Sequence, residues 1–357
     1  MLRRLHVHNH RLCFVPPIVL QSVAQNGTPQ QRDAALRTLA TDQTFRALRM
    51  AQPPRPVQGP ARRPRPEAME VRPRRTIYDA HHTQDLPGEV VRVEGGPPSQ
   101  DTAVNEAYDG LGLTFEFYRD VYERNSIDDE GLPLDAVVHF GQRYDNAFWD
   151  GRQMVFGDGD IFNRFTAALD VIGHELTHGV VEDEAQLVYF YQSGALNESL
   201  ADVFGSLIKQ RARNQTAEQA DWLIGSELFA GTNLRGVAIR SMKAPGTAFD
   251  DPLLGKDPQP AHMRDYVRTF EDQGGVHINS GIPNHAFYLV ASRLGGHAWE
   301  KAGRIWYETL RDSRVRPNTG FVRFARRTVA NAGELYGTDS PEVRAVTEGW
   351  GQVGIDL

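Results

Sequence analysis

The chain has 357 residues, of which 40% are apolar and 24% charged, so it is long enough for two ordinary domains with a sizeable core. Its single cysteine, Cys13, excludes a disulfide framework within the chain and a structural zinc site built on several cysteines, so any metal must be held by histidines and carboxylates. No apolar stretch approaches the ~18 residues of a membrane-spanning helix, and we expect no membrane segment.

The formal net charge of −7 is unevenly distributed along the chain. Residues 1–75 contain 14 arginines and four acids, a net charge of +10, whereas residues 76–357 contain 25 basic and 42 acidic residues, a net charge of −17. Such asymmetry predicts a separable N-terminal tail. A basic tail can bind nucleic acid, but this tail can equally lie against the acidic remainder of its own chain.

The first 75 residues predict one short helix followed by a linker. The apolar run 14–20 is short and interrupted by two prolines, so it is a poor secretory signal and leaves the compartment open between leaderless export and the cytoplasm. Apolar spacing predicts a short amphipathic helix over Asp33–Met50. Residues 51–75, with seven prolines and seven arginines, predict an exposed linker where proteolytic cuts concentrate; a proline-rich ligand for a recognition domain is the alternative.

The rest of the chain changes from a strand-rich to a helix-rich pattern. Before Gly157, alternating runs separated by turn residues predict strands at Glu89–Val93, Asp135–Phe140 and Gln153–Phe156. From Phe165 onward, helical periodicity predicts helices over Ala167–Glu184, Asn197–Arg213, Gly281–Leu294, Gly296–Arg311 and Gly320–Leu335. A β-rich half followed by an α-rich half predicts an α+β fold with two lobes.

The most informative motif pairs two histidines four residues apart, in His174-Glu175-Leu176-Thr177-His178. On a helix both imidazoles lie on one face and can bind one metal ion, and Glu175 is close enough to take a proton from a water molecule at that ion. Apolar neighbours predict that the helix is buried, and buried histidines and a buried glutamate need partners, which a zinc ion supplies. A chance match on an ordinary helix is the alternative.

A catalytic zinc takes three protein ligands and keeps one position open. Glu198, twenty residues after His178, is the predicted third ligand on a second helix, for which Asn197 is the predicted N-cap. Asp202 lies one turn further on and could accept the free ring N–H of a zinc-bound histidine. For this Glu and Asp taken alone, a solvated helix face is the alternative.

Several collinear segments resemble the thermolysin-like metallopeptidases over most of Thr76–Leu357. Besides the histidine motif they are Asn146-Ala147-Phe148-Trp149, Met154–Gly159, Leu187-Val188-Tyr189, Ser193–Glu198 and Gly274–Gly281. The resemblance implies a two-lobed thermolysin-like zincin fold and the activity of a zinc-dependent endopeptidase on peptide and protein substrates. It implies one catalytic Zn²⁺ bound by His174, His178 and Glu198.

The same resemblance implies roles for further residues. Glu175 would be the general base, and His277 and Tyr189 would donate hydrogen bonds to the oxyanion that forms in the transition state. Asp272 would orient His277. The paired glycines before His277 are independently typical of a tight loop that presents a side chain.

Substrate binding is implied for another group. Arg240 would bind a substrate carbonyl beside the cleaved bond, Asn146 and Ala147 would bind the substrate main chain, and Asn197 and Asp202 would hold the zinc histidines. The pocket next to the cleaved bond would be entirely apolar, which implies cleavage before a bulky hydrophobic residue; its lining would be Phe162, Phe165, Val171, Ile224 and Ile239.

The calcium positions of thermolysin are only partly matched. Asp170 and Asp221 occupy matching positions, but the others hold Lys209, Leu223 and Ser226. Because a lysine cannot bind calcium, we expect the double calcium site to be lost, with Lys209 pairing with Asp170 or a neighbouring acid. Calcium elsewhere stays open.

The N-terminal stretches Cys13–Leu20 and Arg75–Ala80 resemble the protealysin subgroup, which has a short propeptide. The mature chain would then begin between about Arg63 and Thr76. Cys13 could bind zinc in the precursor, since thiolate is a good zinc ligand; a buried thiol is the alternative.

The resemblance divides the chain into three parts: a propeptide with its linker (1–72), a β-rich lobe including the histidine motif (73–186) and an α-helical lobe (187–357). The propeptide would act as an intramolecular inhibitor, and we expect a monomer that has no nucleic-acid or membrane partner. Two other hypotheses stay open. One is a zinc-binding interaction protein without catalysis on the same fold, and the other is a nucleic-acid-binding protein that acts through its Arg-rich segment, with salt-dependent binding.

Overall fold

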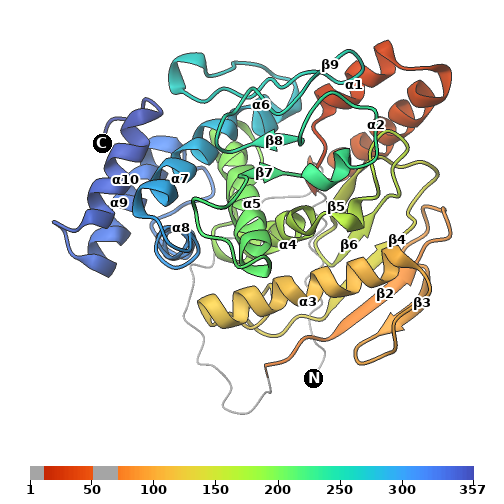
Figure 1. Cartoon of the computed structure of the whole chain (residues 1–357), viewed down its shortest axis with the longest axis horizontal. Helices are drawn as coiled ribbons and strands as arrows, with labels where there is room; N and C mark the ends of the chain where they lie inside the picture. The colour runs from red at the N-terminus through yellow and green to blue at the C-terminus, as the bar shows by residue number, and fades with distance from the viewer. Residues whose placement is uncertain (1–11, 51–70) are drawn as a thin grey trace.

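The computed structural model describes residues 12–50 and 71–357 (Figure 1). Most of the predicted linker, and with it most of the predicted cleavage region, lies outside the described residues. In the described parts of the chain, no helix is long and apolar enough to cross a lipid bilayer.

The largest sheet has six strands in the order β1-β5-β6-β4-β2-β3. Their bounds are β1 (Leu12–Cys13), β2 (Arg75–Asp79), β3 (Glu89–Val93), β4 (Leu134–Val138), β5 (Ala147–Trp149) and β6 (Gln153–Phe156). The neighbours β2, β4 and β6 run parallel, so their carboxyl ends lie at one edge of the sheet. The strands β5 and β1 extend this sheet by antiparallel pairing, so the N-terminal segment itself supplies an edge strand.

Two two-stranded sheets lie later in the chain. One joins β7 (Leu223–Ile224) to β8 (Arg240–Ser241), and the other joins β9 (Asp250–Asp251) to β10 (Gly255–Lys256). In the first of them Ile224 pairs directly with Arg240. This pairing brings a predicted pocket residue next to the predicted carbonyl-binding arginine.

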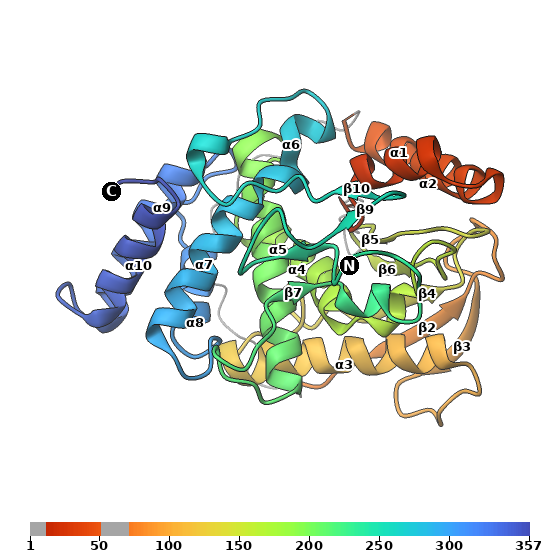
Figure 2. The same ribbon diagram turned by 45° about the horizontal axis from the view of Figure 1, so that its top comes forward.

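Helices make up most of the rest of the described chain. Their bounds are α1 (Pro17–Asn26), α2 (Pro29–Met50), α3 (Thr102–Tyr122), α4 (Leu169–Glu184), α5 (Tyr191–Ala212), α6 (Asp272–Asn279), α7 (Gly281–Leu294), α8 (Ala302–Leu310), α9 (Phe321–Tyr336) and α10 (Pro341–Gln352). Figures 1 and 2 show α3 along the sheet, α4 and α5 in the middle of the molecule, and α7 to α10 on the side away from the sheet. Helices α4 and α5, which carry the predicted zinc ligands, therefore lie between the sheet and the C-terminal helices.

The N-terminal hairpin of α1 and α2 lies beside the β5 end of the sheet (Figure 2). Phe14, Val19, Leu20 and Val23 are fully or almost fully buried and belong to the same continuous apolar cluster as both lobes. Burying each such side chain stabilises the fold by about 1.5–3 kcal/mol. The hairpin is therefore packed into the core rather than resting loosely on the surface.

The structure confirms the α+β class and most predicted helices, with shifted ends. The strand prediction Gln153–Phe156 and the helix prediction Gly281–Leu294 match β6 and α7. The prediction that Asn197 caps a helix is wrong, because α5 already begins at Tyr191 and Asn197 lies inside it. The predicted helix from Gly296 is shorter, since α8 begins at Ala302.

Two helices were not predicted in the first half of the chain. Helix α1 begins at Pro17, where a proline is tolerated because the first helical N–H has no partner anyway. Helix α3 falls in the region predicted to be mainly strands, although Asp101 caps it by accepting a hydrogen bond from the Ala103 N–H. That capping residue and the buried apolar face of α3 were the signals available in the sequence.

Candidate active site

Two adjacent helices bring together the predicted zinc ligands. His174 and His178 lie one turn apart on α4, and Glu198 faces them from α5. The two Nε2 atoms are 3.1 Å apart, and each lies 3.5 Å from a carboxylate oxygen of Glu198. All three side chains are buried, and their ligand atoms form a group able to hold a metal ion.

This geometry fits a zinc ion. Ligand atoms about 2.0–2.1 Å from a tetrahedral zinc are roughly 3.3 Å apart, close to the separations observed here. The Glu198 Oε2 atom is buried without a hydrogen-bond partner among the described residues, and the two imidazole Nε2 atoms face one another. A cation between these three atoms satisfies all of them at once.

The outer ring nitrogens of both histidines are fixed by hydrogen-bond partners on α5. The His174 Nδ1 lies 2.8 Å from Asp202 Oδ1, and the His178 Nδ1 lies 2.8 Å from Asn197 Oδ1. Such bonds place the proton on Nδ1 and leave Nε2 free for the metal. Both residues therefore lie where the resemblance implies, although Asn197 does so from inside a helix.

Asp202 also connects the ligands to Arg240, the predicted carbonyl-binding arginine. Arg240 donates two hydrogen bonds of 2.8 Å to its carboxylate, and Asn284 on α7 donates a third, also of 2.8 Å. Burial alone would raise the pKa of Asp202, but Arg240 and His174 hold that pKa below its ordinary value. Asn284 was missed in the sequence, where an amide in a helix carries no signal.

Glu175 follows the first zinc ligand on α4 and is fully buried. Its Oε2 atom accepts a hydrogen bond of 2.9 Å from the main-chain N–H of Trp149 on β5. This bond ties the carboxylate to the strand that pairs with the N-terminal segment. The carboxylate therefore connects helix α4, which carries the two histidines, to strand β5, with which the N-terminal segment pairs.

His277 and Tyr189 lie on the other side of the ligands. The His277 Nδ1 lies 2.7 Å from Asp272 Oδ1, and its Nε2 lies 3.2 Å from the Tyr189 hydroxyl, which also hydrogen-bonds Glu198. Burial lowers the pKa of His277, but Asp272 and Glu198 outweigh this and raise it. The left-handed Gly274 and Gly275 let the chain turn tightly between Asp272 and His277.

The N-terminal segment contacts several of the predicted substrate-binding residues. It pairs antiparallel with β5, and the Phe14 N–H donates to the Ala147 carbonyl at 3.1 Å, while the Val15 N–H donates to Asn146 Oδ1 at 2.8 Å. His277 Nε2 lies 2.9 Å from the Cys13 carbonyl oxygen, and Arg240 donates to the Phe14 carbonyl at 3.0 Å. Four predicted substrate-contacting residues thus bind three consecutive residues of the chain itself.

The Phe14 side chain points from this segment into the protein. Its ring packs edge-on against the His174 ring at a centroid distance of 5.2 Å and lies under the Arg240 guanidinium at 4.4 Å. Gly225, directly after β7, lies against the ring as well. A Cβ atom at this position would lie only 3.0 Å from the ring, so there is little room for a larger residue. Phe14 shares the main apolar cluster with all five predicted pocket residues, namely Phe162, Phe165, Val171, Ile224 and Ile239.

Cys13 points the other way, because successive side chains of a strand alternate between its faces. Its buried thiol packs in a second apolar cluster that includes Val137, Phe140 and Phe148. It is absent from the groups of described residues that could hold a metal. The interpretation of Cys13 as a buried thiol therefore agrees with the structure.

Helix α2 contacts the loop that carries Asn146, a predicted substrate-binding residue, and this contact was not predicted. The buried carboxylate of Asp42 accepts hydrogen bonds from the Tyr144 hydroxyl at 2.7 Å and from Asn146 Nδ2 at 3.0 Å. Thr38 accepts a further bond of 3.1 Å from the Asp145 N–H. The N-terminal part of the chain therefore contacts the predicted substrate-binding residues through residues 13–15 and also contacts, through α2, the loop that carries Asn146.

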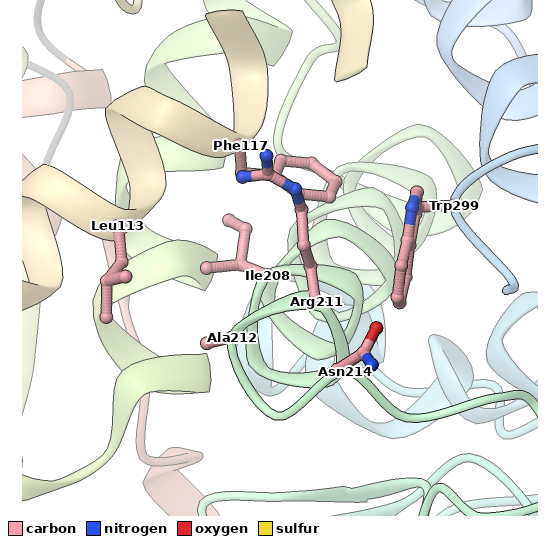
Figure 3. A pocket seen from close by; sticks show the side chains of 7 residues that line it. All are labelled: Leu113, Phe117, Ile208, Arg211, Ala212, Asn214 and Trp299. Atoms are coloured by element: carbon pink, nitrogen blue, oxygen red, sulfur yellow. The ribbon is translucent and has the colours of Figure 1, made fainter. Parts of the chain in front are cut away.

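A pocket of about 330 Å³ lies apart from this site (Figure 3). It is lined from α3 by Leu113 and Phe117 and from the end of α5 by Ile208 and Arg211, with Trp299 opposite. Ile208 is ten residues beyond Glu198 on the same helix, a separation of about 15 Å along its axis. The pocket therefore contributes nothing to the chemistry at the zinc ligands.

Comparisons with known proteins agree with this geometry. A family model described as the thermolysin metallopeptidase catalytic domain matches residues 37–182, and one described as its alpha-helical domain matches residues 185–355. An extracellular metalloprotease of Pectobacterium carotovorum subsp. carotovorum is 53% identical over 96% of both chains, and protease PrtS of a Photorhabdus species is 48% identical over 98% of this chain and 94% of its own.

A solved structure is also similar. The precursor of protealysin, a metalloproteinase from Serratia proteamaculans, is 52% identical, with a TM-score of 0.86 over 96% of this chain and 99% of that chain. The family matches, the relatives and the buried His-His-Glu group lead to one conclusion. The chain belongs to the thermolysin family of zinc metallopeptidases and is a metalloendopeptidase.

Proposed function

We propose that the chain is made as a zymogen in which its own N-terminal segment occupies the substrate cleft as an intramolecular inhibitor. One observation carries this proposal: the peptide groups of residues 13–15 are hydrogen-bonded by His277, Arg240, Asn146 and Ala147. These are residues expected to bind a substrate on both sides of the cleaved bond. No other peptide can pair with β5 while β1 is in place.

The segment also indicates how a substrate binds. In this proposal the Cys13–Phe14 peptide bond marks the position of the bond to be cleaved, with the chain antiparallel to β5. Asn146 and Ala147 then align the substrate main chain, and Arg240 binds the carbonyl that follows the cleaved bond. The alignment holds the reacting groups in place before reaction, which is a large part of the catalytic effect.

Four residues carry the proposed proton and charge chemistry. When bound, zinc lowers the pKa of a water ligand and polarises the carbonyl of the cleaved bond. Glu175 takes the proton of the attacking water and passes it to the leaving amine. His277, oriented by Asp272, and Tyr189 donate hydrogen bonds to the oxygen on which negative charge develops, so they stabilise the transition state more than the bound substrate.

We propose a preference for a bulky hydrophobic residue directly after the cleaved bond. Phe14 occupies that position in the N-terminal segment, and its side chain is fully buried among apolar residues. A benzyl-sized side chain gains about 1.5–3 kcal/mol from such burial. A charged side chain in the same place would lose its hydration without a partner.

The proposal extends to the organisation of the whole chain. Residues 1–72 would be the propeptide with its linker, 73–186 the β-rich catalytic lobe and 187–357 the helical lobe. The substrates would be peptides and proteins, cleaved by a monomer. Because two bacterial relatives carry names that describe extracellular proteases, we propose that this chain also acts outside the cell.

Self-processing tests the proposal directly. The purified full chain is left to stand, sampled by mass spectrometry and assayed on casein with and without a zinc chelator. We expect the N-terminus to be shortened and casein to be cleaved, whereas Glu175→Ala stays full length and inactive. A processed, unaltered protein that leaves casein intact would contradict the proposed activity, and shortening of Glu175→Ala would mean that another protease makes the cut.

A pair of variants in the N-terminal segment tests the inhibition. Phe14→Ala removes the side chain buried against His174, so the segment should leave the cleft sooner and casein cleavage should begin earlier. Leu36→Ala, on the exposed face of α2, serves as the matched control and should leave the time course unchanged. Equal time courses for both variants would contradict the role of Phe14.

A further inference from the structure

A second group of metal-ligating side chains lies at the edge of the six-stranded sheet. It consists of His82, His139 and Asp158, whose ligand atoms all lie within 4.8 Å of one another. The sheet topology brings them together: His82 follows β2, His139 follows β4 and Asp158 follows β6. These three strands are parallel neighbours, so the residues after their carboxyl ends meet at one edge, the place where α/β sheets commonly bind ligands.

The distances within the cluster suit a small cation. The His139 Nδ1 lies 2.7 Å from one oxygen of Asp158, and the His82 Nδ1 lies 3.2 Å from the other. The two imidazole rings are 5.4 Å apart between centroids. Ligand atoms around a tetrahedral zinc are separated by roughly 3.3 Å, so small rotations of these partly exposed side chains would place all three around one ion.

A neighbouring carboxylate completes the arrangement. The His139 Nε2 lies 2.8 Å from Asp101 Oδ2, while the other oxygen of Asp101 caps helix α3. Metal-binding histidines usually donate their second ring N–H to a carboxylate in this way, which fixes the ring and its tautomer. Asp101 therefore leaves the Nδ1 of His139 as the nitrogen available to an ion.

The cluster is also accessible. His82 is 59% exposed and Asp158 is 31% exposed, so water can enter and fill the remaining coordination positions. His82 also lines a pocket of about 590 Å³ between helix α2 and the sheet edge. An ion can reach the cluster without opening the fold.

We propose that His82, His139 and Asp158 bind a second divalent transition-metal ion, separate from the catalytic zinc. Two imidazoles and one carboxylate suit zinc and its neighbours in the first transition row rather than calcium or magnesium, which prefer oxygen ligands. The ion would link the ends of three strands to the start of α3 through Asp101. In its absence the His139 ring makes the same connection, because its two nitrogens contact Asp158 and Asp101.

Metal titration of the full chain tests this proposal. The chain carries Glu175→Ala in every arm, so that it does not cut itself, and is first loaded with one equivalent of Zn²⁺. Co²⁺ is then added and followed by its visible absorption and by bound metal per chain. Co²⁺ binds nitrogen ligands more weakly than Zn²⁺, so it does not displace the first ion. We expect a second equivalent to bind and to raise the melting temperature.

Two variants test the proposed ligands, and a third serves as their control. His82→Gln and Asp158→Asn should each abolish the second equivalent while the first is kept. His81→Gln is the matched control, because the neighbouring His81 contacts Asp79 and Glu89 and should leave the second equivalent intact. In a separate activity assay without Glu175→Ala, His82→Gln should keep full casein activity. Binding of only one equivalent, or a second equivalent that survives His82→Gln, would overturn the proposal.

Discussion

Helices α4 and α5 enclose two buried charged groups, and these groups are balanced in different ways. In the first, His174, His178 and Glu198 converge on a space that a zinc ion fills. In the second, near the start of α4, the Lys209 ammonium lies 2.7 Å from Asp170 Oδ2 and donates a hydrogen bond of 2.6 Å to the Leu223 carbonyl. One group depends on an external cation, whereas the other contains its own.

The difference follows from what each cation has to do. A catalytic ion needs an open position, whereas the Lys209 ammonium is enclosed, with its side chain 1% exposed. Burial lowers the pKa of Lys209, but the nearby Asp170 outweighs this and raises it, so the ammonium stays charged. We infer that Lys209 takes the place of a bound cation there. Its ammonium supplies the positive charge beside Asp170, and it has no lone pair with which to bind a calcium ion.

The largest effect should come from the base beside the zinc ligands. Glu175→Gln keeps the shape of the side chain and an oxygen that can accept from the Trp149 N–H, but it cannot take a proton. General-base catalysis contributes ~10²–10⁴-fold, so kcat on a peptide substrate should fall by that factor. Because Glu175→Gln should not remove its own N-terminal segment, it is first cut by added unaltered protein; zinc content and melting temperature are then the controls and should stay near those of the processed, unaltered protein.

A smaller loss is expected at the oxyanion. Tyr189→Phe removes a hydroxyl that lies 3.2 Å from His277 Nε2 and hydrogen-bonds Glu198. Losing one such donor costs ~10²–10³-fold in kcat, and because the charge exists only in the transition state, KM should change little. A change confined to KM would mean that Tyr189 binds the substrate rather than the transition state.

The two groups also differ in how far the sequence predicts them. His174 and His178 are four residues apart, so helix geometry alone places them on one face. Asp170 and Lys209 are 39 residues apart and meet only because α4 packs on α5. Their pairing was therefore expected from the resemblance rather than from spacing. No local pattern predicted that Phe14 lies against His174, since β-pairing across more than 130 residues depends on the whole fold.

The buried pair of Asp170 and Lys209 should control stability rather than activity. Lys209→Ala leaves the fully buried Asp170 carboxylate without its cation, and breaking a buried pair in this way costs about 3–5 kcal/mol. Denaturant unfolding of the Glu175→Ala background measures this loss without self-digestion. The double variant Lys209→Met, Asp170→Asn removes both charges and should recover most of the lost stability. If the single variant is as stable as its parent, the ammonium has no structural role.

The smallest effect on stability should come from Asp221, the more exposed acid beside Lys209. Asp221 lies 3.5 Å from the Lys209 ammonium and is 37% exposed, whereas Asp170 lies at 2.7 Å and is fully buried. Asp221→Asn removes one charge but keeps an oxygen for the Leu223 N–H, which Asp221 Oδ1 accepts at 2.9 Å. Exposed ion pairs contribute about 0–1 kcal/mol, so the free energy of unfolding should change by less than 1 kcal/mol.

The contrast between these two acids also tests what holds the ammonium in place. If Asp170 alone keeps Lys209 charged, salt should change the stability of the Asp221→Asn protein as much as that of its parent, because salt screens the buried Asp170–Lys209 pair little. A loss comparable to that of Lys209→Ala would instead mean that both acids share the cation, as two carboxylates share a bound metal ion. Lys209 would then balance the negative charges of both acids, the buried Asp170 and the partly exposed Asp221.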